Sequence, residues 1–376
     1  ITGANDKPTI EVVDVTGAVT ELGIATGNLS DTGTLTFTDV DLTDTHTISP
    51  VTPSVGALGN LTATVTTDTT GTGFGGVITW NYSVASIAVE YLAQGQTKEE
   101  TFSFNVLDGN GGSVPRTVTV TITGTNDSPD ITVGTGDSAS ASITETNAVI
   151  TDTGTLTVVD PDLSNTVTAA VDSVTVDASS TFAGTQPTNA ALKAMLSVTA
   201  GAIAANSGDK NNLSWTFNSG SNSAFDFLAA GETLVLKYVV KVTESDAAAT
   251  TDIQTVTVTV TGTNDIPDIT VGTNDSAAAG ITETNAVMPA AAESLVPTVM
   301  SGITATGTLT VVDADLANTV TAAVDSVSVK NTSTFAGTNP LSNADLKAML
   351  SVTSGAIAAN SGDSSNISWT FSSGTN

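Results

Sequence analysis

The feature that most constrains the fold of this chain is internal repetition. The segment GTLTVVDPDLSNTVTAAVDSV (154–174) returns as GTLTVVDADLANTVTAAVDSV (307–327). An Asn-Asp-x-Pro motif begins at Asn5, Asn126 and Asn264, so its copies are 121 and 138 residues apart. This spacing suits one domain of ordinary size per copy. We therefore expect a tandem array, in which a tail of a preceding repeat (1–8) is followed by repeat 1 (9–126), repeat 2 (127–264) and repeat 3 (265–376).

Within each repeat, the sequence alternates with a period of two residues. Segments such as TVTVTITG (117–124) and TVTVTVTG (255–262) place β-branched residues at every second position, which is typical of strands. Turn clusters such as DGNGG (108–112) separate these segments. About seven strands per repeat predict an antiparallel Ig-like β-sandwich with Greek-key connections. The expected fold class is all-β, with tandem sandwiches in an extended array.

The core of such a sandwich must be mainly aliphatic, because only 4% of the residues are aromatic. Trp80, Trp215 and Trp369 occupy equivalent positions in the three repeats. We expect these tryptophans to be buried in the core and not to form a ligand platform. Short helical turns are expected at 87–93 and 189–196.

Repeat 3 differs from repeat 2 in two ways. Trp215 is followed by two long strand patterns (232–244 and 253–261), whereas only 7 residues follow Trp369. We expect repeat 3 to lack its last two strands, either because the sequence is a window from a longer array or because another chain supplies them. Repeat 3 also contains 15 extra residues, MPAAAESLVPTVMSG, which we interpret as a surface loop.

The composition restricts the possible partners. The chain has 38 acidic and 9 basic residues and a formal net charge of −29. This balance argues against binding to DNA, RNA or an anionic membrane, which requires clustered Lys and Arg, and it favours cations. The lack of cysteine excludes disulfides and thiolate metal sites. No apolar run is long enough to span a membrane.

An enzymatic function has little support in the sequence, and we expect none. His46 is the only histidine, and we interpret it as an exposed strand residue, so histidine-based catalysis cannot recur across the repeats. No glycine-rich phosphate loop precedes a helix. Paired carboxylates could hydrolyse glycosides, but acids that recur in every repeat suit a structural role better.

Pairs of aspartates follow the Asn-Asp-x-Pro motifs at a set distance. Asp6 and Asp127 each precede a pair by 33 residues, and Asp265 precedes its pair by 48 residues because of the insertion. The pairs are Asp39/Asp41, Asp160/Asp162 and Asp313/Asp315. Alternate residues of an extended segment point to the same side, and Pro161 would hold one pair extended. Two such carboxylates repel each other unless a cation lies between them.

Carboxylate and amide oxygens of this kind suit Ca²⁺. Asp and Asn are also ordinary turn residues, and a single Asp-x-Asp at the end of a strand needs no ion. Three pairs in step with three Asn-Asp motifs favour calcium, and a glutamate precedes each pair (Glu21, Glu145 and Glu283). We therefore predict calcium sites beside the joints of the array.

The motifs GTND-x-P-x-I and GTLT-x-x-D-x-D, together with EYLAQGQTKEETFSFNVLDGNGG (90–112), resemble the VCBS repeat of large bacterial RTX-type adhesins. The resemblance covers essentially the whole chain and is closest in repeat 1. It implies a protein secreted to the bacterial cell surface by a type I system. Because ESDAAATTD (244–252) replaces DGNGG in repeat 2, we interpret Asp108 and Asn110 as residues of a hairpin turn and not as ligands.

The linker is also similar to that of cadherins, whose repeats are joined by Asp-x-Asn-Asp-Asn-x-Pro. In that family, calcium is bound by a Glu of the leading domain, the linker, and an Asp-x-Asp of the following domain. Carried over by position, the resemblance implies a first set of Glu21, Asn126, Asp127, Asp160 and Asp162, and a second set of Glu145, Asn264, Asp265, Asp313 and Asp315. The remaining metal candidates, at the start of repeat 1, are Asn5, Asp6, Asp39 and Asp41. The first Asp and the second Asn of the cadherin linker are missing here, which implies fewer ions or weaker binding.

Together these features predict a calcium-stabilised extender region of a secreted bacterial surface adhesin, active in cell adhesion or biofilm formation. Its expected partners are calcium ions and neighbouring repeats of the same chain. Two alternatives stay open. In one, the loops of a sandwich recognise a glycan or a protein. In the other, the chain is a subunit of an extracellular filament or surface layer, completed by strands from neighbouring copies.

Overall fold

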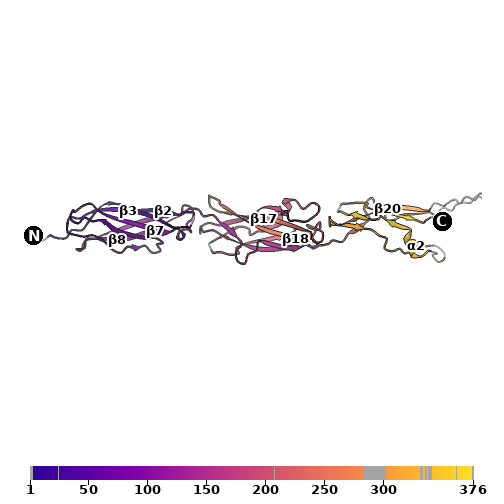
Figure 1. Ribbon diagram of the computed structural model, residues 1–376, viewed down its shortest axis with the longest axis horizontal. Coiled ribbons are helices and arrows are strands. Elements are labelled where there is room, and N and C mark those ends of the chain that lie inside the picture. The colour runs from indigo at the N-terminus through magenta and orange to yellow at the C-terminus, as the bar shows by residue number, and fades with distance from the viewer. Residues whose placement is uncertain are drawn as a thin grey trace, which may run out of the picture.

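A computed structural model describes residues 3–23, 25–206, 208–282, 302–330, 333–334, 337, 341–360 and 362–374. Nearly all of the regular structure is β-strand, and the strands form three units in an extended row (Figure 1). The expected all-β fold of tandem sandwiches is confirmed. Among the described residues, no helix is long and apolar enough to cross a membrane.

Repeat 1 is a sandwich of two sheets that enclose one core. In order across the first sheet, the strands are β1 (Thr9–Val13), β3 (Asn28–Thr38), β7 (Gly76–Ala85) and β6 (Asn60–Thr67). Across the second sheet they are β2 (Thr16–Thr20), β9 (Ser113–Thr123), β8 (Thr97–Leu107) and β4 (Thr47–Ile48), while β5 (Thr52–Pro53) also pairs with β8. A 3₁₀ turn, η1 (Ser86–Ala88), follows β7 near the expected helical turn.

Repeat 2 has the same arrangement. Its first sheet contains β10 (Asp130–Thr132), β12 (Thr151–Val159), β16 (Leu213–Asn218) and β14 (Leu196–Val198). Its second sheet contains β11 (Ser140–Thr144), β18 (Thr251–Thr261), β17 (Thr233–Glu244), β13 (Val167–Val176) and β15 (Ala202–Ile203). Helix α1 (Asn189–Ala194) lies at the second expected helical turn.

One pairing in each complete sandwich departs from the antiparallel expectation. The chain first pairs in one sheet and then crosses to the edge of the other, where it runs beside the last strand of the same repeat. As a result, β2 pairs with β9 in parallel, and β11 pairs with β18 in parallel, each over five residue pairs. All other strand pairs within these sheets are antiparallel.

The three equivalent tryptophans are buried, as expected: Trp80, Trp215 and Trp369 expose 0%, 1% and 8% of their surface. Each indole Nε1 donates a hydrogen bond to a main-chain oxygen on the crossover between the sheets. The acceptors are Asp14, Ser138 and Ser276, at 2.7, 2.7 and 2.6 Å. Each ring also covers a glycine of the neighbouring strand (Gly33, Gly154 and Gly307), where a β-carbon would collide with the ring. The tryptophan and the glycine therefore act together to fix the crossover.

The expectation that His46 is an exposed strand residue is wrong. His46 precedes β4 and is only 5% exposed. Its Nδ1 lies 2.6 Å from Oδ1 of Asp68, and its Nε2 lies 3.1 Å from Oδ2 of Asp39. The ring also packs edge-on against Phe37, with centroids 4.8 Å apart. The imidazole can be buried because two carboxylates satisfy its nitrogens.

Repeat 3 retains the first sheet of the sandwich. That sheet contains β19 (Asp268–Thr270), β20 (Thr304–Val312), β24 (Ile367–Ser372) and β22 (Leu350–Val352), and helix α2 (Asn343–Ala348) precedes β22. Opposite it, the described residues form only the short pair β21 (Thr319–Thr321) and β23 (Ala356–Ala358). Glu283 and almost all of the insertion lie outside the described residues.

Candidate metal centres at the repeat junctions

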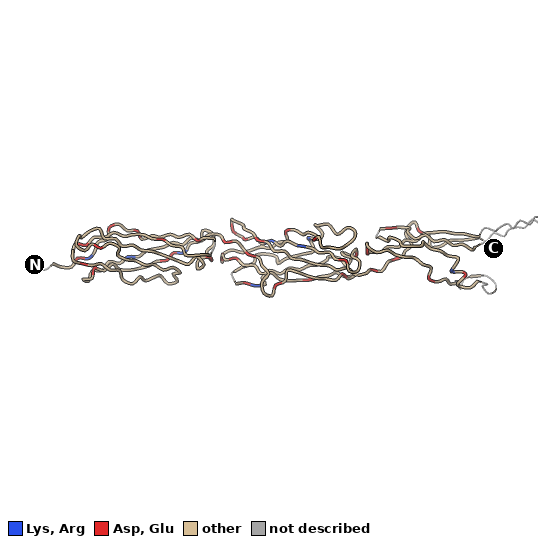
Figure 2. The backbone as a smooth tube through the Cα atoms, viewed as in Figure 1, with Lys and Arg blue, Asp and Glu red and all other residues tan. Residues whose placement is uncertain are grey.

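Acidic residues lie at the places where one repeat meets the next (Figure 2). The aspartate pair that begins each of these clusters lies just after a strand and not within one. In each pair, Oδ1 of the first Asp accepts a hydrogen bond from the main-chain N–H of the second. The distances are 2.9 Å for Asp39/Asp41, 3.0 Å for Asp160/Asp162 and 3.0 Å for Asp313/Asp315. The expected extended geometry is therefore replaced by an Asx turn, which a short carboxylate side chain favours.

At the first junction, the linker and both repeats contribute carboxylates. The main-chain N–H of Asp127 donates to Oδ2 of Asp162 at 3.1 Å, and the N–H of Thr125 donates to Oε2 of Glu21 at 2.8 Å. A main-chain hydrogen bond also joins the two sandwiches, from the N–H of Leu163 to the carbonyl of Tyr91 at 3.4 Å. Asp160 lies in the same turn as Asp162. Four of the five residues that the cadherin resemblance implied for this junction therefore lie together: Glu21, Asp127, Asp160 and Asp162.

The fifth implied residue, Asn126, is oriented by its side-chain amide. Its Nδ2 donates to the carbonyl of Asp127 and to Oε1 of Glu244, both at 2.9 Å. This orientation leaves Oδ1 of Asn126 buried and without a hydrogen-bond partner. The amide therefore presents an oxygen, and not a donor, to the interior of the junction.

Three acids at this junction were not among the sequence-based candidates: Glu90, Glu244 and Asp246. Glu90 follows η1, and its carboxylate lies within 4.8 Å of those of Glu21 and Asp127. Glu244 is the last residue of β17, and Asp246 lies in the turn between β17 and β18. The signal that could have revealed them is positional, since Glu244 of repeat 2 stands where repeat 1 has Asp108, and Glu90 of repeat 1 stands where repeat 2 has Asp226.

The first junction contains many buried oxygens that lack any partner. In the described part of the chain, seven of them are carboxylate or amide oxygens, contributed by Glu21, Asn126, Asp127, Asp160, Asp162, Glu244 and Asp246. Among the described residues, the ion pairs formed by Lys join Lys237 to Asp177 and Lys241 to Asp172, both away from this cluster. Buried carboxylates without a counter-charge are costly, because desolvation and mutual repulsion both disfavour the ionised form.

The electrostatics of the junction follow from this arrangement. Burial raises the pKa of Glu21 and of Asp127 to about 7, and neighbouring carboxylates act in the same direction. Burial likewise raises the pKa of Asp160 and of Asp162 to about 6, with the carboxylates of Glu244 and Asp246 adding to the effect. Four acids in one cluster thus gain protons far more readily than they would in water.

The second junction repeats the plan with fewer acids. The N–H of Asp265 donates to Oδ2 of Asp315 at 2.9 Å, and the hydroxyl of Thr263 donates to Oε2 of Glu145 at 2.6 Å. The side chain of Asn264 donates to the carbonyl of Asp265, and Asp313 holds Asp315 in its turn. The unpartnered buried oxygens here belong to Glu145, Asp226, Asp265 and Asp315. Burial raises the pKa of Asp226 and of Asp315.

A third cluster lies at the end of repeat 1 that faces away from repeat 2. The N–H of Asp6 donates to Oδ2 of Asp41 at 2.7 Å, and Nδ2 of Asn5 donates to Oδ2 of Asp108 at 2.8 Å. The carboxylates of Asp39, Asp44 and Asp108 approach within 4.8 Å of one another. The interpretation of Asp108 as a turn residue alone was incomplete. It does accept hydrogen bonds from the N–H groups of Asn110 and Gly112 in the turn, but it also faces two other buried acids.

Donors of this kind fit a hard cation. Carboxylate and carbonyl-type oxygens, several per site, are the ligands that Ca²⁺ takes in proteins. The buried oxygens without hydrogen-bond partners at both junctions are free to bind such a cation. No described histidine or thiol lies among the acids of the two junctions, which disfavours the transition metals that prefer nitrogen or sulfur.

No family model matches the chain, and no match was found among curated proteins. Among solved structures, a protocadherin gammaB7 fragment (EC3-6) aligns with 98% of this chain and 65% of its own length, at 12% identity and a TM-score of 0.37. For mouse cadherin-23 EC22-24 the corresponding values are 83%, 79%, 13% and 0.32. For human protocadherin-24 EC1-2 they are 69%, 98%, 19% and 0.31. The chain is similar to these cadherin extracellular fragments only at low identity. The description of its fold therefore comes from its own strand pairings.

Proposed function

We propose that this chain is a non-catalytic extracellular extender, in which calcium ions at the junctions hold neighbouring β-sandwiches in line. The single observation that supports this function best is the group of seven unpartnered buried carboxylate and amide oxygens at the first junction. Those oxygens come from repeat 1, from the linker and from repeat 2, so any ion that binds them connects two domains.

The residues that would hold the ions fall into three groups at the first junction. Repeat 1 supplies Glu21 and Glu90, the linker supplies Asn126 and Asp127, and repeat 2 supplies Asp160, Asp162, Glu244 and Asp246. Calcium would contribute positive charge that the cluster otherwise lacks. The protein contributes the rest: Asx turns aim the aspartates inward, the Asn126 amide presents its oxygen, and burial excludes water that would otherwise weaken the interaction.

At the second junction, Glu145, Asp226, Asn264, Asp265, Asp313 and Asp315 would act in the same way. At the tip of repeat 1, Asn5, Asp6, Asp39, Asp41, Asp44 and Asp108 would form a site of the same kind. We propose the repeat boundaries at 126/127 and 264/265, because each junction cluster is centred on these linker residues.

We infer further that the parent molecule is a large secreted bacterial surface adhesin of the VCBS type. The support for this inference is the set of repeat motifs in the sequence, from GTND-x-P to the closing TVTVTITGTND. The second candidate, a subunit of a filament or surface layer, is favoured by one observation. The inner face of the first sheet of repeat 3 is incompletely covered by the described residues.

The proposal is tested by removing calcium from the purified chain. In EDTA, the melting temperature should fall, and small-angle scattering should report a smaller maximum dimension because the junctions bend. Added calcium should reverse both changes, whereas the same concentration of magnesium should be less effective because it accepts the flexible carboxylate sites poorly. Unchanged melting and unchanged scattering in EDTA would rule out calcium as the stiffening agent.

A further inference from the structure

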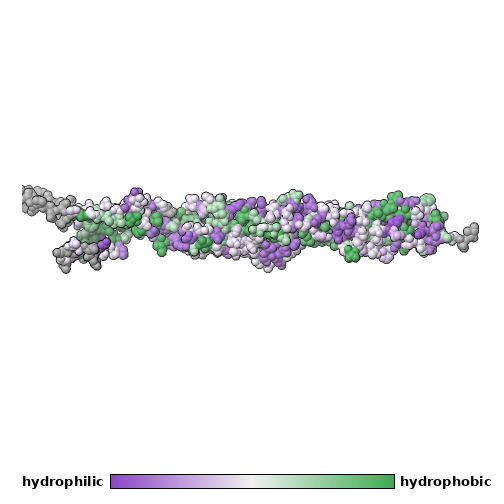
Figure 3. All heavy atoms as spheres, turned by 180° about the vertical axis from the view of Figure 1, so that it is seen from behind, coloured by the Kyte–Doolittle hydropathy of each residue, from purple (hydrophilic) through white to green (hydrophobic). Residues whose placement is uncertain are grey.

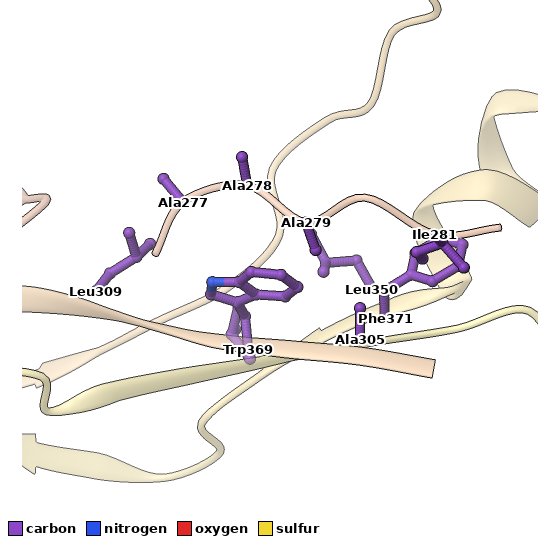
Figure 4. Close-up of a pocket in the computed structure, with 10 residues that line it drawn as sticks. Ala277, Ala278, Ala279, Ile281, Ala305, Leu309, Leu350, Trp369 and Phe371 are labelled. Carbon is purple, nitrogen blue, oxygen red and sulfur yellow. The ribbon is translucent and has the colours of Figure 1, made fainter. Parts of the chain in front are cut away.

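Repeat 3 contains an open apolar groove on the inner face of its first sheet. The groove has a volume of about 410 Å³. Its floor is formed by Leu309, Leu350, Val352, Trp369 and Phe371, and its rim by the segment 277–281 (Figure 4). Figure 3 shows apolar residues at the surface of this end of the rod. Apolar side chains that line a sheet face in this way need a covering layer.

Repeat 2 shows what covers the equivalent face. There, strands β17 and β18 place a row of side chains against the first sheet, all 0% exposed. They are Leu234, Leu236, Tyr238, Val240, Val242, Val256, Val258 and Val260. Beneath them, Leu156 and Phe217 are 0% exposed, whereas their counterparts Leu309 and Phe371 in repeat 3 are only partly buried. The two floors have the same residue types, so they suit the same cover.

The covering strands also explain why one nearly identical segment is a strand in repeat 2 and largely not a strand in repeat 3. VTAAVDSVTV (167–176) forms the ten-residue strand β13, which pairs with β17 along its whole length. VTAAVDSVSV (320–329) differs at one position, yet it is strand only at Val320 and Thr321 within that segment. Strand conformation depends on pairing and burial. Among the described residues, no strand takes the place of β17 beside 320–329.

A second hollow in repeat 3 lies at the second junction and is polar. It has a volume of about 580 Å³, and its lining includes Asn264, Asp265, Asp313 and Asn318. At the first junction the equivalent space is filled by the turn between β17 and β18. There, Nδ2 of Asn126 donates to Glu244 at 2.9 Å, and the N–H of Thr166 donates to Oγ of Ser245 at 3.0 Å.

In repeat 2, one β-hairpin fills both equivalent spaces: its strands cover the apolar face, and its turn fills the polar hollow. We propose that repeat 3 is an acceptor site for an antiparallel β-hairpin of the same chemistry as 233–261, which can be supplied in trans. Such a hairpin has alternating aliphatic residues on one face and an acidic turn of the Glu-x-Asp kind. Its first strand would pair with 320–329, its second strand would pair in parallel with 277–281, and its aliphatic face would cover the groove.

The acidic turn adds a consequence that rests on the calcium function proposed above. In repeat 2, Glu244 and Asp246 contribute two of the unpartnered oxygens of the first junction. The second junction lacks counterparts of these two acids among the described residues. A docked hairpin would bring them there, so occupation of the acceptor site should strengthen cation binding at the second junction.

The test uses the whole chain and a peptide of residues 231–263, carried on a soluble fusion partner. Binding is measured by fluorescence anisotropy of the labelled peptide, and pairing is measured by hydrogen exchange of 320–329 in the chain. We expect saturable binding and exchange in 320–329 slowed at least about tenfold, because ladder hydrogen bonds protect backbone amides. A peptide with Leu236→Asp and Val258→Asp places charges on its apolar face, so it should neither bind nor protect.

A third peptide, with Glu244→Gln and Asp246→Asn, separates the two parts of the proposal. It should bind and protect 320–329 as well as the parent peptide does, but only the parent should lower the calcium concentration needed to protect 264–268. If the parent binds in EDTA and calcium changes nothing, the calcium function fails and the acceptor site stands. If the parent does not bind in either condition, the acceptor site is wrong. Protection of 320–329 before any peptide is added, in a chain that dimerises, would also overturn it, because a second copy would already fill the groove.

Discussion

The main-chain N–H of Asp127 donates a 3.1 Å hydrogen bond to Oδ2 of Asp162 beside the boundary between repeats 1 and 2. The same bond joins Asp265 to Asp315 at the second boundary, at 2.9 Å. In both cases, one oxygen of the second aspartate is held by the linker, and the other, Oδ1, is buried without a partner. The linker thus orients a carboxylate while leaving one of its oxygens available to a cation.

Neutralising the aspartate pair should therefore loosen the first joint. In the double variant Asp160→Asn with Asp162→Asn, most of the calcium-dependent rise in stability should be lost, which for one site at about 100 times its Kd is about 2.7 kcal/mol. Scattering in calcium should show a more bent chain, and in EDTA neither sandwich should be less stable than in the parent. Asp325→Asn with Glu99→Gln is the matched control, because it removes the same two charges at exposed positions. If unfolding of repeat 2 dominates over bending, the ion lies inside that repeat and the joint hypothesis is wrong.

The raised pKa values predict how stability depends on pH without calcium. Glu21 and Asp127 have pKa values of about 7 and Asp160 and Asp162 of about 6, whereas in the unfolded chain these acids titrate near their ordinary values of about 4. Between these limits the folded chain binds more protons than the unfolded chain, so its stability falls as pH rises. In EDTA, the melting temperature should be higher at pH 5 than at pH 8.

Calcium should reverse this dependence, because protons compete with the ion for the same oxygens. The calcium-induced rise in melting temperature should therefore be large at pH 8 and small at pH 5. Thermal unfolding at both values of pH, with EDTA and with saturating calcium, measures the effect. A calcium response that is equal at both would show that the four acids do not hold the ion.

The acids that the sequence analysis missed should act at separate joints. Glu244→Gln with Asp246→Asn should weaken calcium binding at the first junction only, whereas Asp226→Asn should act at the second, where it faces Asp265 and Glu145. Pairs of fluorescent labels that flank each junction would report bending by energy transfer. The two variants serve as controls for each other, and a response of both junctions to either variant would contradict this assignment.

The contact between tryptophan and glycine in each repeat makes a prediction about stability alone. Gly154→Ala would push a methyl group into the ring of Trp215 and the carbonyl of Ser138. Overpacking of this kind costs about 1–3 kcal/mol, so the urea midpoint of repeat 2 should fall. Gly280→Ala is the control, because no atom lies within 4 Å of the added carbon. An equal effect of both substitutions would show that the close packing has no energetic weight.

The elements that sequence analysis predicted well depend on local patterns. The period-two alternation predicted the strands, and the equivalent tryptophans predicted the core, because both signals depend on which side chains a sheet buries. The acid pairs were placed beside the joints by their constant distance from the linker motifs. In each case, the residue type and its spacing carried the information.

The features that were missed depend on contacts between distant segments. The burial of His46 requires Asp68, which is 22 residues away in the sequence. An alternating pattern of residues does not reveal such a pair. Glu90 and Glu244 were overlooked because the repeats conserve acidity at these positions but not residue type. The difference between 167–176 and 320–329 is clearest of all, since nearly the same ten residues adopt different structures according to whether β17 lies beside them.

The parallel pairing of the second and last strands of a complete repeat has a consequence for a chain pulled at both ends. In repeat 2, tension would pass through β10 to β11 and leave through β18, and β11 and β18 run in the same direction. The force would then shear all five residue pairs between β11 and β18 together, from Ser140 with Thr257 to Thr144 with Thr261. The pairs could not separate one at a time. A complete sandwich in this row should therefore resist stretching well beyond what its equilibrium stability suggests, and 277–281 gains the same protection only when a strand lies alongside it.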